Sequence, residues 1–447
     1  MGPPARAEVD VDGKAPDGGK VKRIRGLRAA RNVATPLVDD RVRRYYLFQA
    51  CIGFQLWLPF WALWLLQHAN YFQATLVDVA FWIVSLLMTV PAGALADRFG
   101  RKPALTIGTA VFTIGTVLFG FVQSLPLFAL ANGIWALGAA FLWSSASAYL
   151  FDTLAEAGQE ARYPMIVSRA ALVTFLASAA ACAVAGALVQ TTQAFNLPLL
   201  VYAIPGAAAV AVALGFLEPG VHRAPSANLV AQIRGGVTTV RASRPILFLI
   251  MFLVLVSLVV YVSSFFRPRF IGDLVQGNYA LMGLVYAGFY VVAAWAGRSV
   301  GRILTRVGEP GALILILCLV FPPFAVMYLV GLGLFSPVAA LILGVVAQVF
   351  FYVVWGLQNP VATTIINRRV DSHQRATVLS VSTFFTTLSL AFFEPLVGLL
   401  SLQVEIGGAL AVLAAISVVP AAYALVGFHR STSRRAMRAA AAPDQGR

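Results

Sequence analysis

Long apolar stretches alternate with short polar connections along almost the whole chain. A helix rises about 1.5 Å per residue, so about 20 apolar residues cross the hydrocarbon core of a bilayer. Twelve stretches are long enough, and they predict transmembrane helices at residues 45–67, 76–95, 104–123, 126–150, 166–189, 196–217, 246–266, 280–297, 311–331, 337–357, 376–400 and 407–428. The stretches lack the strict alternation of membrane β-strands. The chain is therefore predicted to be an all-α, polytopic membrane protein.

The composition favours burial in lipid over folding around a water-soluble core. Of the 447 residues, 60% are hydrophobic and 11% are charged, whereas soluble proteins carry about 25% charged residues. The three cysteines stand far apart and the four histidines form no cluster, so we expect no disulfide, no metal site and no cofactor. The G-x-x-x-x-G-K-[ST] pattern of nucleotide-binding loops does not occur, which argues against ATP hydrolysis.

Positive charge is distributed unevenly between the two sides of the predicted bundle. All of the 33 Lys and Arg residues except Arg267 and Arg269 fall in the tails, or in and beside connections on one side. Because cytoplasmic loops carry the excess of Lys and Arg, both termini are predicted to be cytoplasmic. The net charge of +15 is thus explained by orientation in a membrane and contact with lipids, without nucleic acid. The Ala-rich composition favours a bacterial cytoplasmic membrane.

The longest internal connection divides the chain into two groups of six spans. The predicted organisation is a basic, disordered cytoplasmic tail at 1–44, an N-terminal half at 45–217, a linker at 218–245, a C-terminal half at 246–428 and a cytoplasmic tail at 429–447. Within the linker, apolar residues at helical spacing lie beside two arginines, which predicts an amphipathic helix at the membrane surface. These residues are Leu229, Ile233, Val237, Val240, Arg234 and Arg241. A solvated linker is the alternative.

The two halves carry related sequences after their second spans. Residues 93–105 read GALADRFGRKPAL and residues 301–313 read GRILTRVGEPGAL, separated by nearly half the chain. In an ungapped alignment, Gly93 matches Gly301, Arg98 matches Arg306 and Gly100 matches Gly308. Such a parallel repeat is one of the transporter architectures, in which the substrate site lies between the halves near the membrane midplane.

The run from Gly93 to Lys102 resembles the G-x-L-x-D-R-x-G-R-K signature of the major facilitator superfamily, at its usual place between spans two and three. The span count, the central linker and the weaker second copy are also similar to that superfamily, over residues 45–428. Asp152-Thr-Leu and Arg375-Ala-Thr-Val-Leu-Ser resemble a bacterial subgroup whose substrates are mostly unassigned. The resemblance implies twelve helices in two pseudo-symmetric six-helix halves, and transport by alternating access.

The resemblance also implies a cytoplasmic gate. Asp97 is expected to contact the positive N-terminal end of span eleven, and the three cations Arg98, Arg101 and Lys102 to pair with Asp152 until the halves rock apart. For the cations, a role in orientation alone is the alternative. Gly93 and Gly100 are expected to permit close approach of the chain. The predicted gating set is Gly93, Asp97, Arg98, Gly100, Arg101, Lys102, Asp152, Gly301, Arg306 and Gly308, with Thr305 in place of the second aspartate.

In the family architecture, spans one, four, seven and ten line a central cavity. Their polar and aromatic side chains are the predicted substrate contacts, with packing between helices as the alternative for each. They are Gln49, Gln55, Trp61, Asn132, Trp135, Ser144, Ser257, Tyr261, Gln348, Tyr352 and Trp355. Glu394 in span eleven is the predicted proton carrier, unless it is solvated near the outer face. Asp78 is expected only to complement the N-terminal end of its helix.

These observations predict a monomeric secondary active transporter that exports small lipophilic or amphipathic compounds, with protons as the coupling ion. Two departures weaken the resemblance to drug–proton antiporters: span four lacks their buried arginine, and Ala183–Gly186 replaces their Gly-Pro-Gly-Gly run. Few buried charges favour neutral or amphipathic cargo over highly charged cargo. The alternatives are a proton-coupled importer of a neutral nutrient and a polytopic membrane enzyme, for which no convergent catalytic group is evident.

Overall fold

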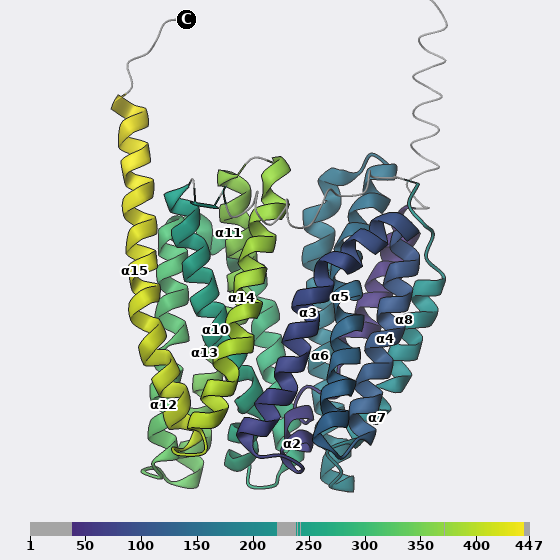
Figure 1. Ribbon diagram of the computed structural model, residues 1–447, viewed down its shortest axis with the longest axis vertical. Helices are drawn as coiled ribbons and strands as arrows, with labels where there is room; N and C mark the ends of the chain where they lie inside the picture. The colour runs from purple at the N-terminus through teal and green to yellow at the C-terminus, as the bar shows by residue number, and fades with distance from the viewer. Residues whose placement is uncertain (1–37, 221–237, 239, 242, 371, 442–447) are drawn as a thin grey trace, which may run out of the picture.

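The computed structural model describes residues 38–220, 238, 240–241, 243–370 and 372–441 of the chain. These residues form one bundle of long, roughly parallel helices joined by short turns, without a strand in the described ranges (Figure 1). The predicted all-α fold is confirmed. The predicted disordered segment up to residue 37 and most of the predicted amphipathic linker helix lie outside the described residues.

The N-terminal half contains the six predicted spans. Span one comprises a helix at 38–53, a turn segment and the short helix α2 (Trp61–Leu66). The following elements are α3 (Tyr71–Phe99), α4 (Arg101–Phe121), α5 (Leu125–Glu156), the 3-10 turn η1 (Glu160–Arg162), α6 (Tyr163–Thr192), α7 (Leu197–Val201) and α8 (Ala203–Leu214). The last two together make span six.

The C-terminal half contains α10 (Arg244–Leu274), α11 (Tyr279–Val320), α12 (Pro322–Gly331), α13 (Pro337–Arg369), α14 (Ser372–Leu400) and α15 (Ile406–Ala441). Helix α11 crosses the bundle twice, because Gly308 interrupts it with φ 69° and ψ −178°. The described residues include 10 continuous segments long and apolar enough to span a membrane. One of them holds spans eight and nine, and the broken span one is additional, so the predicted twelve spans are present.

Span one is a discontinuous helix. Its first part ends at Gly53, whose carbonyl oxygen accepts hydrogen bonds from the Ser178 hydroxyl and the backbone N–H of Gln55, both at 2.8 Å. A side chain at Gly53 would lie 2.9 Å from Thr174 of α6, so the break also marks a close helix contact. Irregular backbone at membrane depth is tolerated where protein groups satisfy its polar atoms, and such breaks are common in transporters.

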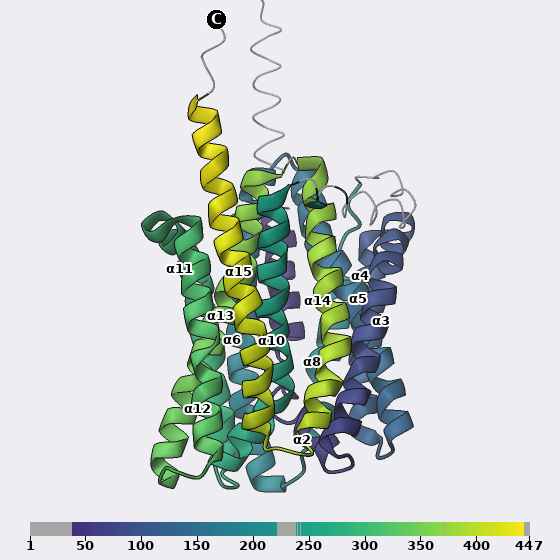
Figure 2. The same cartoon turned by 60° about the vertical axis from the view of Figure 1, so that its left-hand side comes forward.

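The two halves stand side by side and meet along two pairs of helices. Helix α6 packs against α11, and α3 packs against α14; the second pair is seen side by side in Figure 2. We call the end of the bundle that carries residues 93–102 the motif end, and the opposite end the distal end. The helix at 38–53 starts at the motif end, and α15 also finishes there (Figure 1).

Glycines allow the halves to touch at the distal end. A Cβ atom at Gly283 of α11 would lie 2.6 Å from the Cα of Gly186 on α6, and one at Gly398 of α14 would lie 2.3 Å from the Thr75 hydroxyl on α3. Small residues let helix backbones approach closely where no water is available to drive association. The distal contact between the halves therefore depends on these two crossings.

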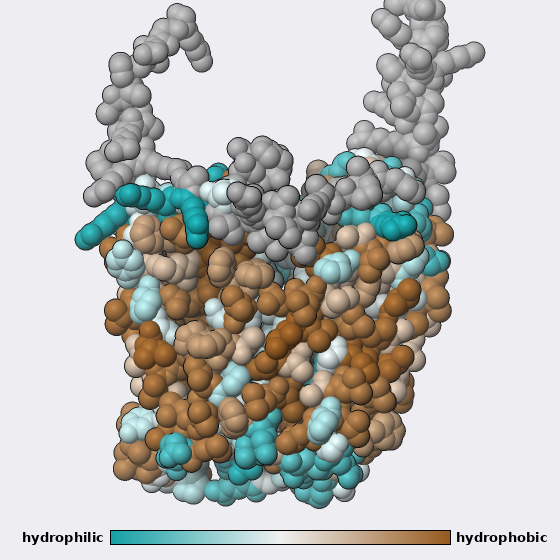
Figure 3. Space-filling model, in the orientation of Figure 1, coloured by the Kyte–Doolittle hydropathy of each residue, from teal (hydrophilic) through white to brown (hydrophobic). Residues whose placement is uncertain are grey.

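A belt of apolar side chains surrounds the bundle. Figure 3 shows hydrophobic residues over the side of the molecule and hydrophilic residues gathered toward its two ends. Large side chains such as Leu87, Trp295 and Val419 are 64%, 65% and 70% exposed. In water such a surface would be unfavourable, whereas lipid tails solvate it. The belt confirms a multi-pass membrane protein.

Helices extend past both terminal boundaries drawn from hydropathy. The first helix already includes Val38, inside the segment assigned to the tail, where Arg41 forms an ion pair with Glu156 at 2.7 Å and Arg44 donates to the Gly215 carbonyl at 2.7 Å. At the other end, α15 continues to Ala441. Hydropathy marks only the apolar part of a helix, so polar continuations beyond the membrane are missed.

The distal crossing makes a stability prediction. Replacing Gly283→Ala inserts a methyl group into backbone contact with α6, and overpacking of this kind costs about 1–3 kcal/mol. Gly288→Ala is the matched control on the same helix, because a Cβ atom there would meet no described atom of a neighbouring element within 4 Å. We expect the purified Gly283→Ala protein to unfold at a lower Tm than wild type, while Gly288→Ala does not. Equal Tm values for the two variants would contradict the glycine crossing.

Candidate functional site

The repeated signature forms a tight connection between α3 and α4. Gly100 alone separates the two helices, with φ 108° and ψ 152°, a backbone conformation that strongly favours glycine. A Cβ atom here would also lie 2.9 Å from the carboxyl group of Glu218. The close approach predicted at Gly100 is therefore present, and both the backbone angle and the available space require glycine.

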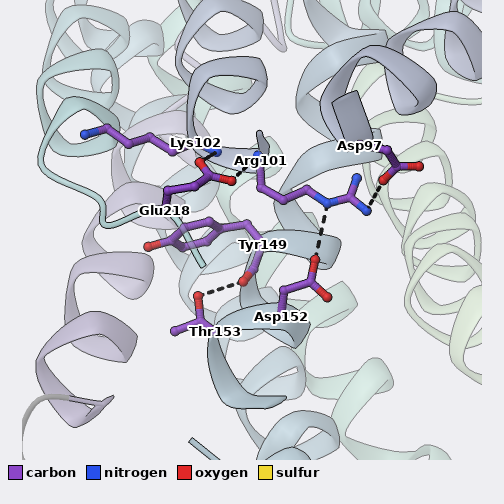
Figure 4. Close-up of polar contacts among 7 residues, drawn as sticks. All are labelled: Asp97, Arg101, Lys102, Tyr149, Asp152, Thr153 and Glu218. Carbon is purple, nitrogen blue, oxygen red and sulfur yellow. Dashed lines mark hydrogen bonds and ion pairs between the residues drawn. The ribbon is translucent and has the colours of Figure 1, made fainter. Parts of the chain in front are cut away.

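Arg101 connects three spans of the N-terminal half through its guanidinium group (Figure 4). Its Nη2 contacts the carboxylate of Asp97 on α3, and its Nε lies 3.3 Å from Oδ2 of the buried Asp152 on α5. Charge-assisted contacts of this kind are strong and directional. The guanidinium of Arg98 instead lies 5.4 Å from the ring of the adjacent Phe99. Lys102 points away from Asp152 in Figure 4, so of the three predicted cations Arg101 makes the expected pair.

Glu218, which no sequence motif indicated, caps α4. Its two carboxylate oxygens accept hydrogen bonds from the backbone N–H groups of Arg101 at 2.6 Å and Lys102 at 2.8 Å. The first N–H groups of a helix have no partners within the helix and carry partial positive charge, so a carboxylate stabilises this end. Because Glu218 lies at the start of the central linker, it ties the linker to the signature.

The second copy of the signature has the same backbone but reversed charges. Gly308 matches Gly100 and also has positive φ, and Glu309 stands where Arg101 stands in the first copy. Glu309 accepts a hydrogen bond from Nε of Arg369 at 2.9 Å, and Arg368 lies 3.6 Å from it. In each half, an ion pair thus joins the start of the third span to the end of the fourth.

Other members of the predicted gating set make fewer contacts. A side chain at Gly93 or Gly301 would meet no described atom within 4 Å, so the close helix approach predicted at Gly93 is absent. Arg306 is exposed. The side chains of residues 372–377, at the start of span eleven, lie outside the described part of the structure. The contact of Asp97 with that helix end therefore stays a prediction.

A buried acidic pair lies between the halves. Asp78 on α3 and Glu394 on α14 lie within hydrogen-bonding reach of each other, and Glu394 is fully buried. The side-chain amide of Asn132 donates a hydrogen bond to Oδ1 of Asp78 at 3.3 Å. The indole N–H of Trp82 donates to Oε2 of Glu394 at 2.9 Å. The solvated position considered for Glu394 is therefore wrong. Asp78 was expected only to complement the N-terminal end of its helix. That expectation missed its contact with Glu394 across the interface.

Aromatic side chains cross the centre of the bundle. Trp61 of α2 lies 5.5 Å from Phe265 of α10, and Trp82 of α3 lies 6.0 Å from Tyr261 of α10. Tyr261 continues to Trp355 of α13, at 5.4 Å. Three predicted substrate contacts, Trp61, Tyr261 and Trp355, thus lie in one aromatic group at the interface. Trp82 was missed because span two was not considered, and Phe265 because only Ser257 and Tyr261 were selected from span seven.

The remaining candidate contacts lie in several surroundings. Trp135 packs among aromatic rings inside the N-terminal half, and Asn132 holds Asp78. Hydrogen bonds tie Gln49 to Tyr45, Ser144 to the Phe141 carbonyl and Gln348 to the Met327 sulfur. Gln55 lies in the break of span one and Ser257 is half-buried in α10. The structure does not gather all eleven candidates in one place.

Arg267 lies elsewhere than the hydropathy pattern predicted. Helix α10 does not end at residue 266 but continues through Arg267 and Pro268 to Leu274. Arg267 is therefore not in a connection, and only 2% of it is exposed. It lies against Tyr352, another predicted substrate contact.

The sequence and the fold both match known transporters. The sequence matches the Major Facilitator Superfamily over residues 46–393. The fold is similar to that of a mutant of the nucleoside transporter NupG. The superposition covers 88% of this chain and 100% of the NupG chain, with a TM-score of 0.71 and 13% identity. The same share superposes on 96% of a POT family transporter in complex with 5-aminolevulinic acid, with a TM-score of 0.62 and 12% identity. The chain belongs to the Major Facilitator Superfamily of membrane transporters.

Relatives in Bacillus subtilis (strain 168) match only in part. The chain is 33% identical to Multidrug resistance protein 2 over 75 residues, which cover 17% of this chain and 19% of that protein. It is 28% identical to the uncharacterized MFS-type transporter YxaM over 137 residues, 30% of this chain and 33% of that protein. These matches span a third or less of each relative, so the similarity covers only part of each transporter.

The ion pair at Arg101 makes a prediction for the motif end. Arg101→Gln removes the guanidinium from the buried Asp152 carboxylate, and we expect this to destabilise the protein by about 1–3 kcal/mol. Arg98→Gln is the control, because this exposed neighbour contacts only the Phe99 ring among the described interactions. The measurement is thermal unfolding of the two purified variants. If Arg98→Gln lowered Tm as much as Arg101→Gln does, the stability would depend on the positive charge of this segment and not on the ion pair of Arg101 with Asp152.

Proposed function

We propose that this transporter is secondary active, couples transport to protons and exports small amphipathic organic molecules by alternating access. The observation that carries the proposal is the Asp78–Glu394 pair between the halves. It joins a titratable group from each half at the helix pair α3–α14, along which the halves would have to move apart. Intramembrane carboxyl groups are costly, and in transporters they commonly relay protons.

The pair links proton binding to the contact between the halves. Two ionised carboxylates within hydrogen-bonding reach repel each other, whereas one bound proton lets one group donate to the other. The described partners of the two groups are Asn132, Trp82 and each other. Proton binding would thus stabilise the distal contact, and proton loss would favour separation of the halves there.

The proposed orientation places the motif end in the cytoplasm. The excess of Lys and Arg at that end supports this placement. Since the halves touch at the distal end through Gly283 and Gly398, the described conformation would then be closed toward the outside. Release of a proton and separation of the distal contact would give the opposite state.

The proposed cargo follows from the aromatic group at the interface. Trp61, Tyr261 and Trp355 offer large apolar surfaces with polar edges, which suit amphipathic molecules. Export is supported by the partial similarity to relatives named as multidrug resistance proteins. Import of a neutral nutrient is the competing direction, and it would use the same coupling pair.

Transport into inside-out proteoliposomes tests coupling and direction. Two permanently charged probes are used, naphthalenesulfonate and naphthylmethyl-trimethylammonium, so that a pH gradient does not change their own charge. With the vesicle interior acidic, we expect wild-type protein to accumulate one of them and a protonophore to abolish the accumulation. For Asp78→Asn and Glu394→Gln, gradient-driven accumulation is expected to fall to the level of protein-free vesicles. Both variants should still exchange probe across the membrane when no gradient is applied.

The matched control for these variants is Asp273→Asn, which neutralises an exposed carboxylate at the end of α10. It should accumulate probe as wild type does. Accumulation that ignores the gradient, or gradient-driven accumulation by Glu394→Gln, would overturn proton coupling through this pair. Gradient-driven loss of probe from the vesicles would overturn export in favour of import.

A further inference from the structure

Among the described residues, one buried guanidinium in the C-terminal half has no carboxylate paired with it. Arg267 lies in α10 and is 2% exposed. The ion pairs within the described part of the chain involve other residues, such as Arg101 and Arg369, and leave Arg267 without a carboxylate. A buried charge is costly unless it is paired, so a compensating negative group is expected to bind here.

The described surroundings satisfy Arg267 only in part. Its Nη2 donates to the Ser263 hydroxyl at 3.2 Å, and the Tyr352 hydroxyl is also within hydrogen-bonding reach. The guanidinium carbon lies 5.3 Å and 4.9 Å from the ring centres of Phe351 and Tyr352. Its Nε, although buried, has no hydrogen-bond partner. Cation–π contacts stabilise the group without neutralising its charge.

Two tyrosines of α11 lie near the same guanidinium. The hydroxyl group of Tyr286 on α11 is buried and has no partner, and Tyr290 lies one turn further along the same helix. Both tyrosines are electrostatic neighbours of Arg267. A planar guanidinium and phenolic hydroxyls are donors that match the oxygens of a carboxylate or sulfonate.

The group of donors borders the interface between the halves. Tyr290 lies 6.4 Å from Phe175 of α6 in the other half. Tyr352 stacks 6.3 Å from Trp355, which belongs to the aromatic group at the centre of the bundle. An organic molecule held at Arg267 would therefore have aromatic side chains available for its apolar body.

We propose that Arg267, with Tyr286 and Tyr352, binds the anionic group of an amphipathic organic anion whose apolar body packs against Trp355 and Tyr290. This inference names the substrate class of the proposed transporter and rests on that function. It narrows the expectation of neutral or amphipathic cargo, because Arg267 adds a buried positive charge inside the bundle. The anion would supply the charge that the described side chains do not.

Binding to the full-length protein in neutral detergent tests this site without requiring transport. The probes are naphthalenesulfonate, its neutral counterpart naphthalenesulfonamide and the cation naphthylmethyl-trimethylammonium. A ligand of the folded state raises Tm according to its affinity. We expect the sulfonate to raise the wild-type Tm more than the other two probes, and Arg267→Gln to bind it about 10- to 100-fold more weakly.

Arg269→Gln is the matched control, since Arg269 is exposed and pairs with Asp273; it should bind the sulfonate like wild type. The ligand-free Arg267→Gln protein should unfold at a Tm no lower than that of wild type, because the variant removes an uncompensated buried charge. A lower Tm without ligand, together with unchanged sulfonate binding, would assign Arg267 a packing role and overturn the proposal.

Three further outcomes separate the possible sources of failure. A Tm rise with added phosphatidylglycerol but not with the sulfonate would make the site one for a lipid headgroup and overturn the cargo assignment. Sulfonate binding that depends on Arg267, combined with no proton-driven accumulation in vesicles, would support the anion site and overturn the coupling proposal alone. Proton-driven accumulation of the cation without sulfonate binding would support the coupling proposal and overturn the anion site alone.

Discussion

The cost of placing charge inside a water-excluding bundle is the constraint on which the other features depend. Most of the chain is apolar and faces lipid or other helices, so the few ionisable groups at depth must find partners. Among the described residues, Asp152 pairs with Arg101 within one half, Asp78 lies beside Glu394 across the interface, and Arg267 is surrounded by hydroxyls and aromatic rings. These three solutions correspond to three proposed roles: holding one half together, coupling the halves to protons and receiving an anion.

The pseudo-symmetry of the halves lies in the backbone and not in the charges. Gly100 and Gly308 both adopt positive φ, and the residue after each forms an ion pair with the end of the following hairpin. Arg101 supplies the base in the first half, whereas Glu309 supplies the acid in the second. The two ion pairs, Arg101–Asp152 and Arg369–Glu309, join corresponding helix ends although acid and base have exchanged places. Each pair therefore holds its own half together. In the proposed cycle, motion would concentrate at the boundary between the halves, where Gly283 and Gly398 permit close contact.

Hydropathy predicted all twelve spans because lipid burial requires long apolar runs, and the repeated signature predicted the tight turn at Gly100. The remaining site residues depend on contacts that sequence spacing does not reveal. Glu218 reaches the start of α4 from a linker far along the chain, and Asp78 meets Glu394 only once the halves are packed. Arg267 was misplaced because an apolar window ends at a charge, whereas a helix continues wherever its backbone hydrogen bonds do. The tail boundaries were displaced for the same reason.

The central claim is that proton binding at Asp78 and Glu394 controls the distal contact between the halves. The most direct measurement is the distance between spin labels at Leu76→Cys on α3 and Leu402→Cys beyond α14, both exposed positions, in proteoliposomes at low and high pH. The distance should be short at low pH and should gain a longer population at high pH, and the distance distribution of Glu394→Gln should not change with pH. A wild-type distance distribution that is the same at both pH values would contradict the account.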